Sequence, residues 1–241
     1  LLGAIPNYLK HHSYGEYVFD HGWATAFERA GGHYYPKLLG AVPFTPVSGP
    51  RLLVPNGRND LKTALAGKVV ELLDKYQLSS AHINFLPEQD AKLLTNYGWL
   101  HRTGIQFHWH NQGFANFDAF LESLSSRKRK NIRKERESVA AAGVTLLPLT
   151  GEAITNVHVN DFYRFYMSTI DRKWGGAYLT REVFTQLQET MADKMLLIMA
   201  KYNGDIIGGA LNFIGEDALF GRNWGADINI PNLHFEACYY Q

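Results

Sequence analysis

The last hundred residues of the chain show the clearest pattern of apolar and polar positions. Three largely apolar stretches are separated by short polar turns, which is typical of strands joined in a meander. Apolar residues at spacings of three and four, upstream of these stretches, favour helices. The predicted elements are, in order, a strand, two helices, three strands and a helix, at residues 144–149, 161–173, 180–193, 194–202, 206–214, 218–224 and from Asn232 onward.

The first 110 residues have a weaker pattern. It predicts alternating elements: a strand at residues 1–9, a helix at 23–30, a β-rich run at 34–47, a helix at 60–78, a strand at 82–86, a helix between Pro87 and Gly98, and a strand at 100–110. The prolines within residues 34–47 favour an edge strand or a bulge over a central strand.

Residues 113–143 carry the strongest local charge. An apolar stripe predicts one helix, and the run RKRKNIRKERE at residues 127–137 predicts a second, with seven basic and two acidic residues. Arginine binds phosphate in a bidentate manner, so Arg127, Arg129 and Arg133 are candidates for contacts with a phosphate-bearing substrate. The alternative is a solvated linker helix whose charges pair with neighbouring acids.

Composition narrows the class of protein without identifying a partner. The chain has 241 residues, is 46% hydrophobic and has a formal net charge of +1, which allows a large core but gives no global signal for polyanion binding. No apolar run approaches the roughly 20 residues of a membrane-spanning helix. The single cysteine, Cys238, excludes an internal disulfide. Because the sequence does not begin with Met, we expect upstream sequence to be missing.

A resemblance to a known family rests on four parts of the chain. They are YLKHHSYGEYVFD (residues 8–20), YYPKLLGAVPFTPVSGPRLL (34–53), FLESLSSRKRKNIRKERE (120–137), and FGRNWGAD (220–227) followed by LHFEACYYQ (233–241). These segments resemble the FemAB-like proteins of the acyl-CoA N-acyltransferase (GNAT) superfamily, predicted N-acyltransferases that are often labelled peptidoglycan biosynthesis or recognition proteins. The resemblance runs from one end of the chain to the other.

The resemblance implies an α/β fold with mixed sheets and two tandem GNAT-like domains. The first, residues 1–112, lacks its start, and the second, residues 144–241, lacks its end. Residues 113–143 form basic connecting helices between them. The order strand, helix, helix, meander, helix over the last hundred residues is that of the first half of a GNAT domain.

The resemblance also implies a function, namely transfer of an acyl or aminoacyl group from an activated donor to an amine. In better-understood relatives the donor is aminoacyl-tRNA and the acceptor is a peptidoglycan precursor, whereas other GNAT proteins use acyl-CoA. The loop at residues 224–236 lacks the Q/R-x-x-G-x-G/A pattern of CoA-binding loops, and Pro231 removes a backbone donor there. Acyl-CoA is therefore a doubtful co-substrate, and no tightly bound cofactor is expected. The family implies a cytoplasmic protein.

The candidate catalytic residues are Asn212 and Arg222 on the predicted meander, and His234 and Glu236 at the start of the last helix. Either of the last two is a potential general base, but two residues apart on a helix they do not face each other. Arg222 either contacts a substrate or forms a structural ion pair.

The candidate substrate-binding residues, besides the three arginines, lie on one strand and at a helix junction: Trp174, Tyr178 and Trp224. Strand alternation places Arg222 and Trp224 on the same face. No metal is expected, because His108 and His110 have no third ligand at a diagnostic spacing.

These observations leave a second class of function open. A binding protein that keeps this fold without chemistry, and recognises a cell-wall precursor or tRNA, fits the same sequence. Acyl transfer would separate the two, and donor, acceptor and oligomeric state are not set by the sequence.

Overall fold

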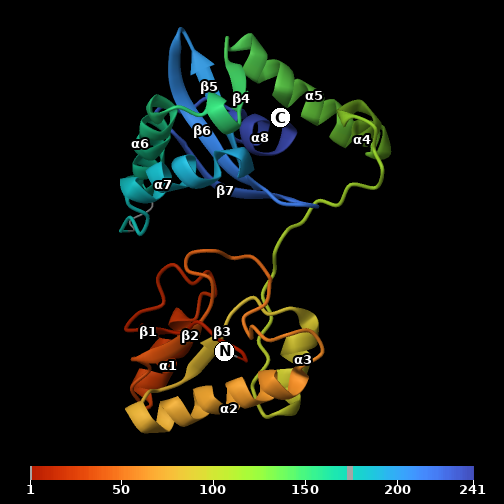
Figure 1. Cartoon of the computed structure of the whole chain (residues 1–241). Helices are drawn as coiled ribbons and strands as arrows, with labels where there is room; N and C mark the ends of the chain where they lie inside the picture. The colour runs from red at the N-terminus through yellow and green to blue at the C-terminus, as the bar shows by residue number, and fades with distance from the viewer. Residues whose placement is uncertain (1, 173–175) are drawn as a thin grey trace. The chain divides into compact units, whose positions relative to one another are not determined.

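The chain forms two compact units in the computed structural model, which describes residues 2–172 and 176–241 (Figure 1). The first unit is Leu1–Trp109 and the second is His110–Gln241. Each unit combines helices with its own sheet, which confirms the predicted α/β class. The basic helices of residues 113–143 belong to the second unit by this division.

The first unit has a three-stranded mixed sheet in the order β1-β2-β3. Its strands are β1 (Tyr8–Lys10), β2 (Lys37–Gly40) and β3 (Ala81–Ile83); β1 is antiparallel to β2, and β3 is parallel to it. Its helices are α1 (His21–Arg29), α2 (Asn59–Tyr76) and α3 (Glu88–Asn96). Leu52, Ala66 of α2 and Leu94 of α3 form its apolar core against Ile83.

Two predictions for the first unit are wrong. The strand expected within residues 34–47 is the central strand and not an edge strand, because the prolines flank Lys37–Gly40 instead of interrupting it. The strand expected at residues 100–110 does not form, and Leu100 and Phe107 are 98% and 97% exposed. Alternating apolar residues need a neighbouring strand to pair with, and in the described part of this unit the segment has none.

The second unit contains an antiparallel meander in the order β4-β5-β6-β7. The strands are Thr145–Leu149, Met195–Tyr202, Asp205–Ile214 and Leu219–Ala226. The helices are α4 (Phe117–Ser123), α5 (Ser126–Ala141), α6 (Asn156–Arg172), α7 (Arg181–Met191) and α8 (Leu233–Phe235), with short 3₁₀ turns at Gly151–Ala153 and Ala192–Lys194. The last helix is a single α-helical turn followed by a π-helical segment, Glu236–Tyr240.

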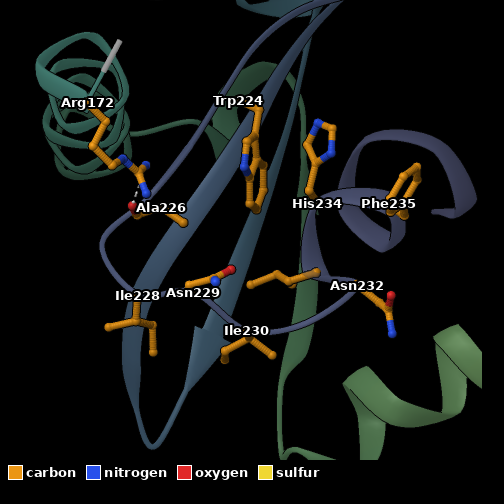
Figure 2. A pocket seen from close by; sticks show the side chains of 10 residues that line it. Arg172, Trp224, Ala226, Ile228, Asn229, Ile230, Asn232, His234 and Phe235 are labelled. Atoms are coloured by element: carbon orange, nitrogen blue, oxygen red, sulfur yellow. Dashed lines mark hydrogen bonds between the residues drawn. The ribbon is translucent and has the colours of Figure 1, made fainter. Parts of the chain in front are cut away.

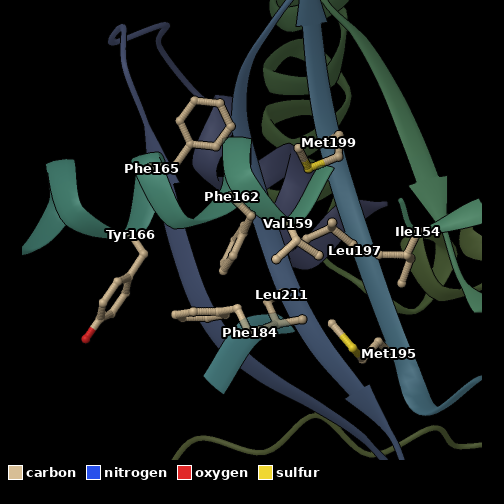
Figure 3. Packing of buried hydrophobic residues seen from close by; sticks show 10 residues of the cluster. All are labelled: Ile154, Val159, Phe162, Phe165, Tyr166, Phe184, Met195, Leu197, Met199 and Leu211. Carbon is tan, nitrogen blue, oxygen red and sulfur yellow. The ribbon is translucent and has the colours of Figure 1, made fainter. Parts of the chain in front are cut away.

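Helices cover both faces of this sheet. Figure 1 shows α6 and α7 on one face and α5 and α8 on the other. The α6 face holds the main apolar core, in which Phe165 and Met199 are completely buried (Figure 3). The α8 face holds smaller clusters around Ala200, Ala210 and Trp224.

The sheet and α6 approach most closely at Gly225 on β7. A Cβ atom at this position would overlap the backbone carbonyl of Phe165, so only glycine allows the helix to lie at this distance from the strand. This contact fixes the end of β7, which carries the candidate site.

A β-bulge interrupts the pairing of β6 with β7. Leu211 pairs with Asn223, but the next residue, Asn212, pairs with Gly221, so Arg222 has no residue opposite it. The extra residue resets the alternation of side chains. Simple alternation ends at the bulge, so the strand pattern no longer assigns Arg222 and Trp224 to one face.

Candidate functional site

A small pocket of about 160 Å³ lies where β7 ends and the chain turns into α8 (Figure 2). Its wall combines apolar and polar side chains from α6, β7, the loop after β7, and α8. They include Arg172, Trp224, Asn229, Asn232, His234 and Phe235. A concave site with a few convergent polar groups is the usual form of a small-molecule site.

Trp224 and His234 form one wall of the pocket. Their rings are 5.6 Å apart between centroids and inclined by 55°, and Figure 2 shows them side by side. The other edge of the Trp224 ring packs against the cluster on the α8 face of the sheet, so this residue holds the core and lines the pocket at once. His234 is exposed and also makes an edge-to-face contact with Tyr239. Of the predicted site residues, these two are the pair that the pocket brings together.

Arg172 supplies a positive charge to the opposite wall. Its guanidinium donates hydrogen bonds to the carbonyls of Ala226 (3.2 Å) and Ser168 (3.1 Å), which orient it at the end of α6. An arginine held by neutral carbonyls keeps its full charge for an anionic group. Arg172 is not among the predicted site residues, because a basic residue in the last turn of a helix is common for dipole reasons alone and carries no functional signal.

Arg222 lies at the bulge, near Tyr166. The Tyr166 hydroxyl accepts a hydrogen bond from the Leu179 amide (3.2 Å), and the Tyr178 ring contacts the Tyr166 ring edge-to-face. Burial raises the pKa of Tyr166, and the nearby charge of Arg222 opposes that rise. Beside Arg222, the side-chain oxygen of Asn223 is buried and has no hydrogen-bond partner among the described residues. A buried acceptor of this kind is a ready partner for a donor on a ligand or a water molecule.

Asn212 is part of the sheet and not of the pocket. It is 5% exposed, and its amide nitrogen donates to the carbonyls of Leu196 (3.2 Å) and Ala210 (3.4 Å). These hydrogen bonds account for both donors of its amide group.

Glu236 is held in a buried ion pair. Both of its oxygens accept from Arg136, at 3.0 to 3.1 Å, and its side chain is 9% exposed. The Arg136 guanidinium also lies 4.6 Å above the Phe117 ring. Both oxygens of Glu236 are therefore engaged by Arg136, and Glu236 is not among the residues that line the pocket on β7. The pair joins α5 to the C-terminal helix, and the sequence analysis did not anticipate it.

The three arginines predicted to bind substrate differ in their surroundings. Arg129 donates to the carbonyl of Glu122 (3.2 Å), Arg133 lies 3.8 Å from Asp118, and Arg127 is exposed. None of them lines the pocket on β7. Trp174, the remaining predicted residue, lies outside the described residues.

Within residues 2–172 and 176–241, no three His, Cys, Asp or Glu side chains are grouped so that they could ligate a metal ion. None of the helices in these same ranges has the length and hydropathy that crossing a bilayer requires.

The fold and the pocket together define a two-unit α/β protein with a small pocket at the end of a bulged strand. The chain belongs to the FemAB-like family, whose model, described as peptidoglycan biosynthesis/recognition, matches residues 1–241. No curated protein matches the sequence.

Proposed function

We propose that the protein is an N-acyltransferase that joins an acyl or aminoacyl group to an amine of a peptidoglycan precursor. The two units would be tandem GNAT-like domains, with the pocket of the second unit binding the activated donor. Family membership supports the reaction class, and the order of the meander and its flanking helices supports the GNAT relationship.

The observation that carries the proposal is the bulge at Arg222, two residues before Trp224 and on the same strand as the pocket wall. The extra residue of a bulge is left out of the strand ladder, and bulges are frequent next to active sites. The guanidinium of Arg222, on the bulged residue, would stabilise the oxyanion that forms when an amine attacks a carbonyl carbon.

The residues around the pocket would divide the remaining work. His234, exposed beside Trp224, would take the proton from the attacking amine, and Arg172 would bind a phosphate or carboxylate of the donor. Glu236 is excluded from the base role in this proposal by its pairing with Arg136.

The attack would be direct: the amine nitrogen forms an amide bond to the acyl carbon, the bond from that carbon to the tRNA oxygen or the CoA sulfur breaks, and no covalent enzyme intermediate forms. Burial raises the pKa of Cys238 to about 12, so its thiol stays protonated at neutral pH and is a weak nucleophile. Aminoacyl-tRNA and acyl-CoA are both candidate donors, and the absence of a glycine-rich loop before α8 favours the former.

The test is product detection by mass spectrometry. The protein is incubated with a peptidoglycan-precursor peptide that carries a free amine, and with either an aminoacyl-tRNA or an acyl-CoA. A mass increase on the amine with one donor supports the proposal. No product with either donor, together with measurable binding of the precursor, would favour the second candidate, a non-catalytic binding protein. That candidate is supported by one observation, the engagement of both Glu236 oxygens by Arg136.

A further inference from the structure

The outer face of α5 carries a row of positive charges. Arg127, Lys130 and Lys134 recur at spacings of three and four, so they lie on one side of the helix, and Lys128 adjoins them in the first turn. All four are exposed. Over the described residues, none of the four has a hydrogen bond or an ion pair. The row spans about 10 Å of helix length.

The opposite side of α5 faces the protein. Val139 is buried there, and Arg136 is held by Glu236. Arg129 bonds to a backbone carbonyl and Arg133 lies near Asp118. The basic run is thus divided: three of its four arginines contact the protein, and three lysines with one arginine remain directed to solvent.

We propose that this row of Arg127, Lys128, Lys130 and Lys134, the basic face of α5, is a docking surface for an anionic lipid membrane. Four cations outnumber the one acid on this side of the helix, Glu137, so like charges repel one another and a densely negative partner relieves that repulsion. The four cations project from one helix, so a flat surface can meet several of them together. The proposal does not depend on the pocket or on its chemistry.

The residue types favour a lipid surface over a nucleic acid. Single-stranded nucleic acids are bound by basic grooves that also offer aromatic rings for base stacking, and this face has no aromatic side chain. Lysine acts as a point charge, which suits a surface of mobile anionic headgroups, whereas the arginines suited to bidentate phosphate recognition are mostly engaged elsewhere. The exposed face also has no apolar residue, so attachment would be electrostatic, without insertion between the acyl chains.

The electrostatic character gives a measurable salt dependence. A basic residue close to an anionic membrane strengthens binding about fivefold, so removal of three should weaken partitioning about a hundredfold. Screening lengths fall from about 10 Å at 0.1 M salt to about 3 Å at 1 M, so binding should disappear as salt is raised.

The experiment measures co-sedimentation of the whole chain with vesicles of phosphatidylglycerol and phosphatidylcholine, and with vesicles of phosphatidylcholine alone. We expect binding to the anionic vesicles only, lost at high salt, and weakened about a hundredfold in Arg127→Gln/Lys130→Gln/Lys134→Gln. The three side chains are exposed, and an unchanged melting temperature confirms that the variant is folded.

A matched control removes the same charge elsewhere. Lys68, Lys75 and Lys92 of α2 and α3 are exposed, and their joint replacement by Gln lowers the net charge equally. This variant should bind anionic vesicles as the unaltered protein does.

Four results would overturn the proposal. The first is a control variant that loses as much vesicle binding as the triple variant of the basic face, and the second is binding to phosphatidylcholine vesicles as strong as binding to anionic ones. The third is a lack of binding of the unaltered protein to anionic vesicles at low salt. The fourth is binding to a homopolymeric RNA that depends on the basic face, while vesicle binding does not depend on it. The last result would assign the face to a nucleic acid.

Discussion

Replacement of Lys37 by Met should destabilise the first unit strongly and in a pH-dependent way. Lys37 is completely buried on the central strand, and its ammonium group donates to Ser13 (2.7 Å), Glu16 (2.9 Å) and Asp20 (2.6 Å). The second oxygens of Glu16 and Asp20 are buried and have no hydrogen-bond partner among the described residues. Methionine fills a similar volume but leaves two carboxylates without their counter-charge.

The size of the effect follows from the carboxylates' ability to take up a proton. Burial alone would raise the pKa of Asp20, but hydrogen bonds, led by that from Lys37, outweigh it and hold this pKa well below its ordinary value. Without Lys37, a buried carboxylate would become protonated. For an aspartate with an ordinary pKa near 3.9, the free energy of taking up this proton is about 4 kcal/mol at pH 7 and about 1.5 kcal/mol at pH 5. The estimate at pH 7 lies within the roughly 3–5 kcal/mol expected for breaking a buried ion pair.

The sign of the pH dependence distinguishes the two proteins. In the unaltered protein the lowered pKa of Asp20 contributes stability above about pH 4, which is lost as pH falls further. In Lys37→Met, by contrast, the deficit relative to the unaltered protein should shrink between pH 7 and pH 5, because protonation relieves the buried charge.

The assay is native-state hydrogen exchange of the amides in β2 and β3, which reports the first unit separately from the second. The control is Lys37→Met combined with Glu16→Gln and Asp20→Asn, which removes all three charges and should recover most of the loss. A single variant that loses less than about 1 kcal/mol at pH 7, or a triple variant as unstable as the single one, would refute the electrostatic argument.

Three further predictions concern single residues. Gly225→Ala should destabilise the second unit by at least about 1–3 kcal/mol in urea denaturation, because its Cβ would overlap the Phe165 carbonyl. Gly67→Ala, in an open position of α2, should instead stabilise the first unit by about 0.5–1 kcal/mol. Similar effects at the two glycines would count against the close packing at Gly225. Burial and the charge of Lys37 lower the pKa of His82 to about 4, so the unfolded chain binds more protons than the folded chain between about pH 6.5 and 4. The stability of the first unit should therefore fall by at most about 3 kcal/mol as the pH is lowered through this range. His82→Gln should abolish this fall, and replacement of the exposed His33 should leave it intact. The Cys238 thiol should resist alkylation by iodoacetamide at pH 7.5 in the folded protein, as read by mass spectrometry, since its pKa is about 12; rapid labelling would contradict the buried environment.

The sequence predicted the elements of the second unit well because they are long and regular. The meander strands and helices α6 and α7 lie within a few residues of their expected positions, since alternation and helical spacing are both strong there. The segment at residues 100–110 shows the same alternation as a strand, yet strand formation depends on a partner that local pattern does not encode. The central position of β2 was missed for a similar reason, since flanking prolines resemble interrupting ones.

The candidate site was predictable only in part. Trp224 and His234 lie where the sequence suggests, because both flank a single turn between adjacent elements. The pairing of Glu236 with Arg136 spans a hundred residues, so no local spacing reveals it. The bulge at Arg222 adds one residue to β7 relative to β6, and only the register of the two strands shows this. The Lys37 cluster likewise joins β2 to the segment between β1 and α1, about 20 residues away in the sequence.

The rate of acyl transfer in site variants tests the proposed role of the second unit. With the donor that yields product, Arg222→Ala or Trp224→Ala should lower the rate about 10²–10³-fold, because these positions form the bulge and the pocket wall, while His108→Ala and Cys238→Ser should change it little. Melting temperatures are measured alongside, because Trp224 also packs in the core. Folded Arg222 and Trp224 variants with undiminished rates, or loss of transfer in Cys238→Ser alone, would contradict direct attack at this pocket.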